Sequence, residues 1–494
     1  MDRAAESPNQ SLDSFAVRVR HAVIWRSGSQ ILAQLVQWTA TFLVIRILDP
    51  RDYGLFAMTG VIMVFLNMLN GYGLASGLVQ RAQVSPREIR QLFGMLVALN
   101  ATLALAQLLI APVAAAYYRQ PLVADLLRVQ ALMYLATPFI ALPSALLSRA
   151  LDFRHQARAN IVASVASAAT ALAGALLGWG VWTLVAAPLV LFAVRGATMT
   201  WSARSLVWPL FDFRGAGHLA RYGGVMAVGQ LFWFLQSQAD VFIAGRYFSA
   251  HELGIYTTSL FLAQIFVAKI VPPLNEVAFS AYARIQHDDD AVVRAFVRSV
   301  GIVMAAALPF YLGLAATAEP MVLTMLGEKW REMVPVVRWL ALAMPFMTLN
   351  VMYGPACDAR GKPGVGVRNG AAGSVILAAG FLVGVRWGPS GMALAWLAAY
   401  PLYLAASSWR SLPVIGASAR AVAAAILPVA IAAIAMALAV RAADAALPAM
   451  ASPARLAALV VIGGITYAAW LAVFARQTLG ALVAVARGRQ ADWI

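Results

Sequence analysis

Charged residues are scarce in this 494-residue chain, making up 12% of it, whereas 62% of the residues are hydrophobic. The mean hydropathy is accordingly high, at +0.76. About a quarter of the residues in an ordinary soluble domain are charged, because a folded surface must be covered with polar groups. The composition therefore excludes a soluble globule of this size and indicates a protein that crosses a membrane many times.

Cysteine is almost absent, since Cys357 is the single one. One cysteine excludes an intramolecular disulfide, and no cysteine and histidine residues have the spacing of a zinc site. The net charge of +16 would suggest nucleic acid in a soluble protein. Here, however, the basic residues gather in alternate short loops, as in membrane proteins. We expect neither a structural metal nor a nucleic-acid partner.

Signatures of common enzyme classes are also missing. The chain has no His-Glu-x-x-His motif and no Gly-x-x-x-x-Gly-Lys-Ser/Thr phosphate loop, and Gly364-Val365-Gly366 follows no Rossmann strand. The largest loop on the expected outer side runs only from Glu319 to Glu332. We therefore expect a protein that is not an enzyme, with no cofactor beyond a coupling proton or sodium ion.

About fourteen segments are long and apolar enough to cross a bilayer as helices. They cover residues 28–47, 54–75, 92–117, 123–147, 159–178, 181–201, 219–246, 254–275, 295–318, 333–354, 366–385, 390–409, 419–441 and 455–475. The predicted fold is an all-α membrane protein with two six-helix bundles and two accessory helices.

The predicted domains follow from this grouping. A cytoplasmic arm covers residues 1–26, the two bundles cover 27–210 and 211–412, and the accessory helices with a cytoplasmic tail cover 413–494. The arm lacks the apolar core and cleavage site of a signal peptide. The excess of Lys and Arg in alternate loops places both termini in the cytoplasm.

A short hydrophilic turn occurs twice in the chain, at residues 44–56 and 244–256. Without any gap, Arg46 corresponds to Arg246, and each copy lies between two membrane-length segments. A repeat of this kind indicates duplicated halves, an organisation typical of transporters that work by alternating access.

Charged residues in the two turns form a candidate outer gate: Arg46 and Asp52 in the first copy, Arg246 and Glu252 in the second. Salt bridges between the halves would close such a gate. A solvated cap on each turn is the alternative, because exposed ion pairs contribute little free energy.

Polar side chains follow one face of the first segment, where Gln30, Gln34 and Gln37 are spaced by four and three residues. The functional interpretation is a hydrated cavity that binds hydroxyl-rich groups, and the alternative is hydrogen bonding between helices, worth about 0.6 to 2 kcal/mol per contact. The predicted cavity residues are Gln30, Gln34, Gln37, Asn67, Asn70, Gln230, Trp233, Gln236, Gln264 and Lys269.

Three ionisable residues are expected deep in the membrane: Asp240, Lys269 and Arg195. A charge at mid-bilayer costs at least about 2.5 kcal/mol, so each needs a partner or water. Asp240 either titrates or binds a coupling cation, or it pairs with Lys269 or Arg246 to join two helices. Arg195 is likewise a candidate for coupling or for helix pairing. Lys269 either contacts a phosphate or extends to the interface.

Several ordered motifs resemble a known family. They are Leu-Leu-Ser-Arg-Ala-Leu-Asp-Phe-Arg at 146–154, Gly-Trp-Gly-Val-Trp-Thr-Leu-Val at 178–185, the stretch from Asp240 to Gly-Ile-Tyr at 254–256, and Phe-Ser-Ala-Tyr-Ala-Arg-Ile-Gln at 279–286. Over roughly residues 20–410 the chain is similar to Wzx-type exporters of exopolysaccharide and lipopolysaccharide, within the multidrug/oligosaccharidyl-lipid/polysaccharide (MOP) superfamily.

This resemblance implies two six-helix bundles arranged as a V around a central cavity, with two further helices outside. It implies flipping of an undecaprenyl-diphosphate-linked oligosaccharide across the bacterial inner membrane, for exopolysaccharide, capsule or O-antigen synthesis. Expected partners are this lipid, membrane lipids, and a polysaccharide polymerase with its export machinery.

Two other functions stay open from the sequence. One is a cation-coupled small-molecule or multidrug antiporter of the same superfamily, which would need Asp240 as a coupling site. The other is a membrane polysaccharide polymerase or acyltransferase, against which the short outer loops argue.

Overall fold

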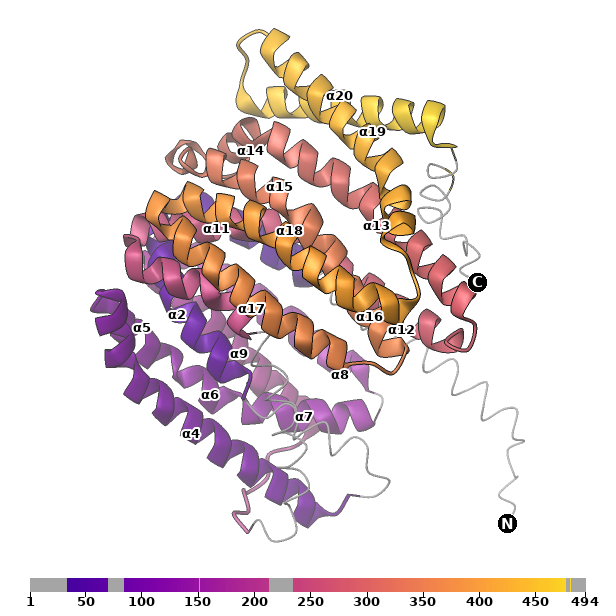
Figure 1. Cartoon of the computed structure of the whole chain (residues 1–494). Helices are drawn as coiled ribbons and strands as arrows, with labels where there is room; N and C mark the ends of the chain where they lie inside the picture. The colour runs from indigo at the N-terminus through magenta and orange to yellow at the C-terminus, as the bar shows by residue number, and fades with distance from the viewer. Residues whose placement is uncertain (1–32, 70–83, 151, 213–233, 477–479, 481–494) are drawn as a thin grey trace, which may run out of the picture. The chain divides into compact units, whose positions relative to one another are not determined.

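The computed structural model describes residues 33–69, 84–150, 152–212, 234–476 and 480, and in these residues the regular structure is helical with no strand (Figure 1). Ten helical stretches within the described ranges are long and apolar enough to cross a membrane. Each segment expected from the sequence overlaps a helix. The prediction of an all-α membrane protein is confirmed.

The chain divides into two compact units, residues 1–231 and 232–494. The first unit begins with a helix over residues 33–47. Its further helices are α2 (Pro50–Asn67), α4 (Pro86–Tyr118), α5 (Leu122–Gln130), α6 (Leu132–Ala136), α7 (Pro138–Arg149), α8 (Phe153–Leu176) and α9 (Val181–Ala203).

The second unit begins with a helix over residues 234–247. It continues with α11 (Ala250–Lys269), α12 (Val271–Arg284), α13 (Asp289–Ala316), α14 (Ala318–Met325), α15 (Met333–Val351), α16 (Tyr353–Ala359), α17 (Gly364–Gly384), α18 (Gly388–Ile415), α19 (Ala419–Ala446) and α20 (Ser452–Phe474). The expected domain boundaries at 210/211 and 412/413 stay predictions.

The segment expected as one helix over 123–147 is broken into α5, α6 and α7. Pro138 opens α7 and has no N–H group, so it cannot donate to the carbonyl of Tyr134. The N–H of Thr137 donates to Tyr134 and to Met133 instead, at 3.3 and 3.2 Å. Because the backbone acceptor is satisfied, the chain can bend here inside the membrane.

The repeated turn is the same structure in both units. The helices over 33–47 and 234–247 end in register, and the following helices begin at Pro50 and Ala250. In the second copy Ser249 Oγ accepts from the N–H of Glu252 at 3.2 Å, and the Glu252 carboxylate accepts from the N–H of Ser249 at 2.9 Å. This capping box satisfies N–H groups that have no partner within the helix. The duplicated helix–turn–helix is therefore confirmed.

The first copy uses an acid in the same way. The carboxylate of Asp52 accepts from the N–H of Asp49 at 3.3 Å. It is also hydrogen-bonded to the backbone of Val181, the first residue of α9. The adjoining Gly180 has a φ of +55°, and a Cβ added there would approach Asp52 Oδ1 to 3.2 Å. Glycine at this turn thus lets α9 begin directly against α2.

The segment after α9 is attached to α4. The N–H of Leu210 donates to the carbonyl of Arg90 at 2.9 Å, and Arg90 Nε donates to the carbonyl of Trp208 at 3.1 Å. A Cβ on Gly94 would overlap the backbone of Leu210. Glycine at position 94 therefore allows the start of the connection between the units to lie directly on the first unit.

Helices α19 and α20 pack on the second unit. A cluster of buried side chains, Ala316, Met436, Val440 and Leu459, joins them to α13. The hydroxyl of Tyr467 also donates to the carbonyl of Ala305 at 2.7 Å. The last two helices are thus held by side-chain packing and by this hydrogen bond to α13.

Removing the cap of α11 tests the role of the repeated turn. We expect Ser249→Ala to lower the free energy of unfolding by about 1 kcal/mol, because an N-cap hydrogen bond is lost. The measurement is denaturant unfolding of the purified protein in detergent micelles.

Ser280→Ala is the matched control, since the Ser280 hydroxyl donates to the carbonyl of Glu276 within α12 and caps no helix. Equal destabilisation by the two variants would contradict a capping role for Ser249.

Candidate functional site: a polar pocket and a buried carboxyl

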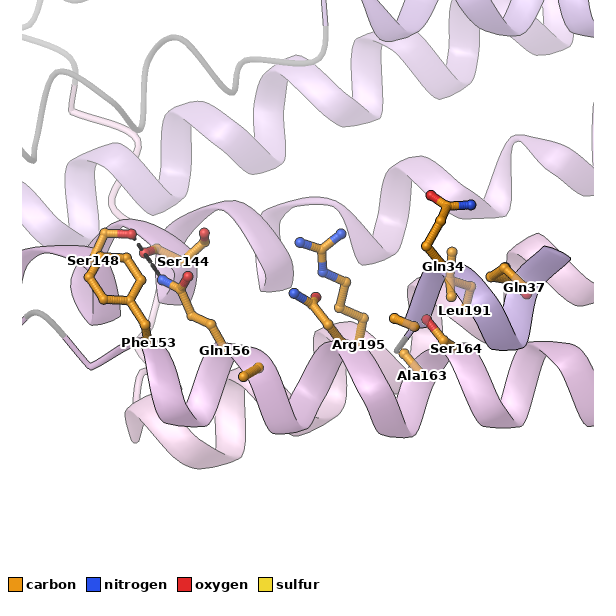
Figure 2. A pocket seen from close by; sticks show the side chains of 13 residues that line it. Gln34, Gln37, Ser144, Ser148, Phe153, Gln156, Ala163, Ser164, Leu191 and Arg195 are labelled. Carbon is orange, nitrogen blue, oxygen red and sulfur yellow. Dashed lines mark hydrogen bonds between the residues drawn. The ribbon is translucent and has the colours of Figure 1, made fainter. Parts of the chain in front are cut away.

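A polar pocket lies within the first unit, between the helix over 33–47 and helices α7, α8 and α9 (Figure 2). Its volume is about 470 Å³. Most of the lining side chains carry amide or hydroxyl groups. The polar lining residues are Gln34, Gln37, Ser144, Ser148, Gln156, Asn160, Ser164 and Arg195.

Helical spacing places these groups on common faces. Gln156, Asn160 and Ser164 are four residues apart on α8, so they follow one side of that helix. The Gln156 amide is fixed by α7, because its Nε2 donates to the carbonyl of Ser144 and to the hydroxyl of Ser148, each at 2.9 Å (Figure 2). The Gln156 side chain is thus oriented before any ligand binds.

Arg195 enters the pocket from α9 and is its only charged residue among those described. Its guanidinium lies between Gln156 at one end and Gln34 at the other (Figure 2). The buried Nε has no hydrogen-bond partner among the described residues. A buried donor without an acceptor costs about 1–3 kcal/mol, and an anion would remove that cost. The geometry therefore suits a phosphate, which guanidinium binds through paired hydrogen bonds.

A second polar centre lies within the second unit. Asp240 is 1% exposed, and its Oδ2 accepts from the hydroxyl of Tyr256 at 2.8 Å. Trp396 Nε1 donates to the same Tyr256 oxygen at 2.8 Å. This chain of hydrogen bonds links the helix over 234–247 with α11 and α18. Asp240 Oδ1 has no hydrogen-bond partner in the described part of the chain.

The expected ion pair of Asp240 is not formed. Within the described residues its side chain contacts neither Lys269 nor Arg246 through a salt bridge. A neutral tyrosine takes the place of the cation. In the register of the repeat, Asp240 and Tyr256 correspond to Ala40 and Phe56. Both positions therefore hold apolar residues in the first copy, and no carboxyl or hydroxyl is left there without a hydrogen-bond partner.

The other predicted cavity residues of the second unit are more dispersed. Gln236 is half-buried and accepts from the hydroxyl of Tyr403 at 3.4 Å, and Gln264 is half-buried on α11. Lys269 is exposed in the last turn of α11, within the membrane-length stretch Ala250–Arg284, and its role in a cavity stays a prediction. A cation is favourable at this position because the end of a helix carries a partial negative charge.

The first unit places Gln34 and Gln37 in the pocket, whereas Asn67 is half-buried at the end of α2. The predictions for Gln30, Asn70, Gln230 and Trp233 concern positions outside the described residues.

The four gate candidates lie at the repeated turns. Arg46 is exposed and Arg246 half-buried. Asp52 and Glu252 each accept hydrogen bonds from their own turn. An outer gate stays a prediction.

Five pocket residues were not predicted: Ser144, Ser148, Gln156, Asn160 and Ser164. Their spacing of four on α7 and α8 is a signal that the sequence contains. The sequence prediction of a cavity rests on the first two segments of each half, and its fifth segment begins at residue 159, three residues after Gln156.

Metal ligands are not gathered in the described residues. No group of three or more His, Cys, Asp or Glu side chains there lies close enough to hold a metal ion.

The fold and pocket agree with a family match. A model described as "Polysaccharide biosynthesis protein" matches residues 43–335, more than half of the chain. The chain therefore belongs to this family, and the resemblance to the Wzx-like flippases of the MOP superfamily is confirmed.

Curated relatives are similar over part of their length. The succinoglycan biosynthesis transport protein ExoT of Rhizobium meliloti is 27% identical over 303 residues, 61% of each chain. The lipopolysaccharide biosynthesis protein WzxC of Escherichia coli is 25% identical over 322 residues, 62% of each chain. The chain thus matches about three fifths of the length of these two relatives.

Solved structures share the fold at low sequence identity. The lipid II flippase MurJ, in an inward closed conformation, superimposes with a TM-score of 0.75 at 12% identity, covering 92% of this chain and 100% of the other. A multidrug transporter of the MATE family, in an inward-facing conformation, gives 0.58 at 13% identity, covering 81% of this chain and 100% of the other. The fold is that of the MOP superfamily.

Coupling between Asp240 and Tyr256 can be measured directly. We expect Tyr256→Phe to destabilise the protein by about 1–3 kcal/mol, because it leaves a buried carboxyl without its hydroxyl donor. The double variant Asp240→Leu/Tyr256→Phe should lose less than the sum of the two single variants, since the Asp240 carboxyl is then not left unpaired, while the loss of the Trp396 hydrogen bond is common to both variants that lack the Tyr256 hydroxyl.

The measurement is a double-mutant cycle in detergent unfolding, with the exposed Tyr247→Phe, on the helix that carries Asp240, as the control. Strictly additive effects would contradict a direct interaction.

Proposed function

We propose that the protein flips an undecaprenyl-diphosphate-linked oligosaccharide from the inner to the outer leaflet of the bacterial inner membrane, for polysaccharide synthesis. The observation that carries this proposal is Arg195, whose buried Nε has no hydrogen-bond partner among the described residues, in a pocket whose other polar groups are amides and hydroxyls. The proposed activity is transport and involves no chemical conversion of the lipid.

The pocket chemistry suits both polar parts of such a lipid. The diphosphate supplies the anion that Arg195 lacks, and sugar hydroxyls exchange hydrogen bonds with Gln34, Asn160 and Ser164. A volume of about 470 Å³ is large enough for the phosphates and the first sugar. A polyprenyl chain has no polar group to offer this pocket, so it stays in the bilayer.

Family membership supports the same class of substrate. The two relatives are named for succinoglycan transport and lipopolysaccharide biosynthesis, and the shared fold includes a lipid II flippase. We extend to this chain a V-shaped arrangement of two bundles with α19 and α20 outside, and both termini in the cytoplasm. The expected partners are a polysaccharide polymerase and export proteins.

The proposed mechanism is alternating access of the two repeat-related halves. Arg195 and the α8 amides bind the diphosphate-sugar head from the cytoplasmic side, where the neighbouring basic residues Arg149 and Arg154 raise the local concentration of anions. Asp240 in the second unit binds the coupling proton or sodium ion. The lipid head is released on the outer side when the two halves change from an inward-facing to an outward-facing arrangement.

A cation-coupled antiporter of small molecules is the second candidate function. The buried Asp240, with one oxygen unpartnered among the described residues, is the observation that favours it. An antiporter would move small cationic compounds and leave lipid-linked sugars undisturbed, so the two functions differ in cargo.

Replacing Arg195 tests the flippase. We expect Arg195→Gln to reduce export at least about tenfold, because a charge-assisted hydrogen bond contributes about 1.5–3 kcal/mol. In a strain that lacks the native gene, the measurement is accumulation of lipid-linked oligosaccharide in the cytoplasmic leaflet.

Arg158→Gln is the control, since Arg158 is exposed on α8 and does not line the pocket. An unchanged leaflet distribution in the absence of the protein would contradict the flippase and leave the antiporter.

Replacing Asp240 tests coupling. We expect Asp240→Asn, which keeps the shape and the hydrogen bond from Tyr256, to abolish the response of transport to an imposed proton or sodium gradient. The measurement is uptake by proteoliposomes under each gradient, with Asp358→Asn as the control carboxyl on α16. If the variant responds like the wild type, Asp240 has only a structural role.

A further inference from the structure

A second, mostly apolar groove lies in the first unit, between α9 and the junction of α6 with α7. Its volume is about 750 Å³. The small residues Ala136, Ala193 and Ala197 line it, with the larger Trp201 and Leu206 beside them. Leu206 is 80% exposed and Trp201 is 87% exposed, so no side chain of the described residues covers either one.

The groove and the polar pocket use opposite faces of α9. Arg195 lines the pocket, whereas Ala193 and Ala197 line the groove. Residues two apart on a helix differ by about 200° in direction, so these alanines point away from the face of Arg195. The groove is therefore a separate site with separate chemistry.

Arg204 lines the same groove where α9 ends. It is exposed and forms no ion pair or side-chain hydrogen bond among the described residues. Its backbone has a φ of +45°, in the left-handed region that glycine normally occupies at a helix end. An arginine is retained here despite a strain of about 1 kcal/mol or more.

Aromatic residues locate this end of the groove at the membrane interface. Trp201 and Trp208 are 87% and 83% exposed on either side of Arg204. Tryptophan is enriched at the level of the lipid headgroups, where an amphipathic ring contacts both water and hydrocarbon. Arg204 therefore lies at the depth of lipid phosphates, and the alanine-lined part lies at the depth of the chains.

We propose that this groove binds one anionic phospholipid of the surrounding bilayer, with a hydrocarbon chain along Ala193 and Ala197 and its phosphate on Arg204. Charge complementarity favours an anionic headgroup, because the cation has no acidic partner in the described residues. The position opposite the polar pocket favours a bilayer lipid over the transported lipid. The proposal does not depend on the proposed function.

The bound lipid stabilises the folded protein by mass action, because it binds the native groove and not the unfolded chain. It contacts α7 and α9, two of the helices that also line the polar pocket. A stabilising effect of anionic lipid should accordingly be present in the full-length protein without any substrate.

Two arginines provide a matched pair of variants. Arg119 and Arg204 are both exposed, both end a helix and both have a left-handed backbone, with φ of 56° and 45°. Arg119→Gly and Arg204→Gly each remove one positive charge and each relieve the backbone, so neither is expected to unfold the protein. Only Arg204→Gly removes the cation of the groove.

The experiment measures retention of phosphatidylglycerol by native mass spectrometry, on full-length protein taken from vesicles of phosphatidylcholine and phosphatidylglycerol. We expect wild type and Arg119→Gly to retain it equally, and Arg204→Gly to retain about tenfold less, the loss typical of one charge-assisted contact. Ala197→Leu should also reduce retention by filling the groove, whereas Ala169→Leu on the exposed face of α8 should not.

Equal retention by Arg204→Gly and wild type would overturn the proposal. An equal loss in Arg119→Gly would also overturn it, because the effect would then be general electrostatic attraction. Displacement of phosphatidylglycerol from the wild type by undecaprenyl phosphate would assign the groove to the transported lipid instead. Since no step measures transport, these outcomes are independent of the flippase test.

Discussion

A positive charge inside a membrane-spanning bundle needs an anion or water, and this requirement organises the first unit around Arg195. Its Nε is buried without a partner in the described residues, while the surrounding Gln, Asn and Ser side chains offer no negative charge. The helices that hold these groups are fixed by contacts elsewhere, including the α2–α9 contact made by Asp52. The first unit thus contains a polar pocket with one cation, Arg195.

The second unit has a buried carboxyl, Asp240, on the helix–turn–helix that both units share. Both copies of the helix–turn–helix begin their second helix at equivalent positions, Pro50 and Ala250, yet only one carries a buried carboxyl. Asp240 and Tyr256 occur as a pair where the first copy has Ala40 and Phe56. Since an unpaired buried polar group is costly, the two polar residues are present together or absent together. Duplication preserved the backbone while the halves acquired different chemistry.

Periodicity in the sequence predicted the helices, the repeat and the polar face containing Gln34 and Gln37. These features are local, so hydropathy and spacing suffice to find them. The spacing of Gln156 and Ser164 carried the same kind of signal. Whether the polar face of α8 lines a pocket, however, depends on which helices pack against it, and this cannot be inferred from the spacing of residues along one helix.

The most direct test of the account is where a transported lipid contacts the protein. Photo-crosslinking of a lipid-linked oligosaccharide carrying a reactive group on its first sugar, followed by peptide mapping, would measure this in membranes. We expect adducts on α8 between Gln156 and Ser164, and their loss on competition with unlabelled lipid. Adducts absent from α8 in a protein that still exports polysaccharide would contradict the assignment of the polar pocket as the substrate site.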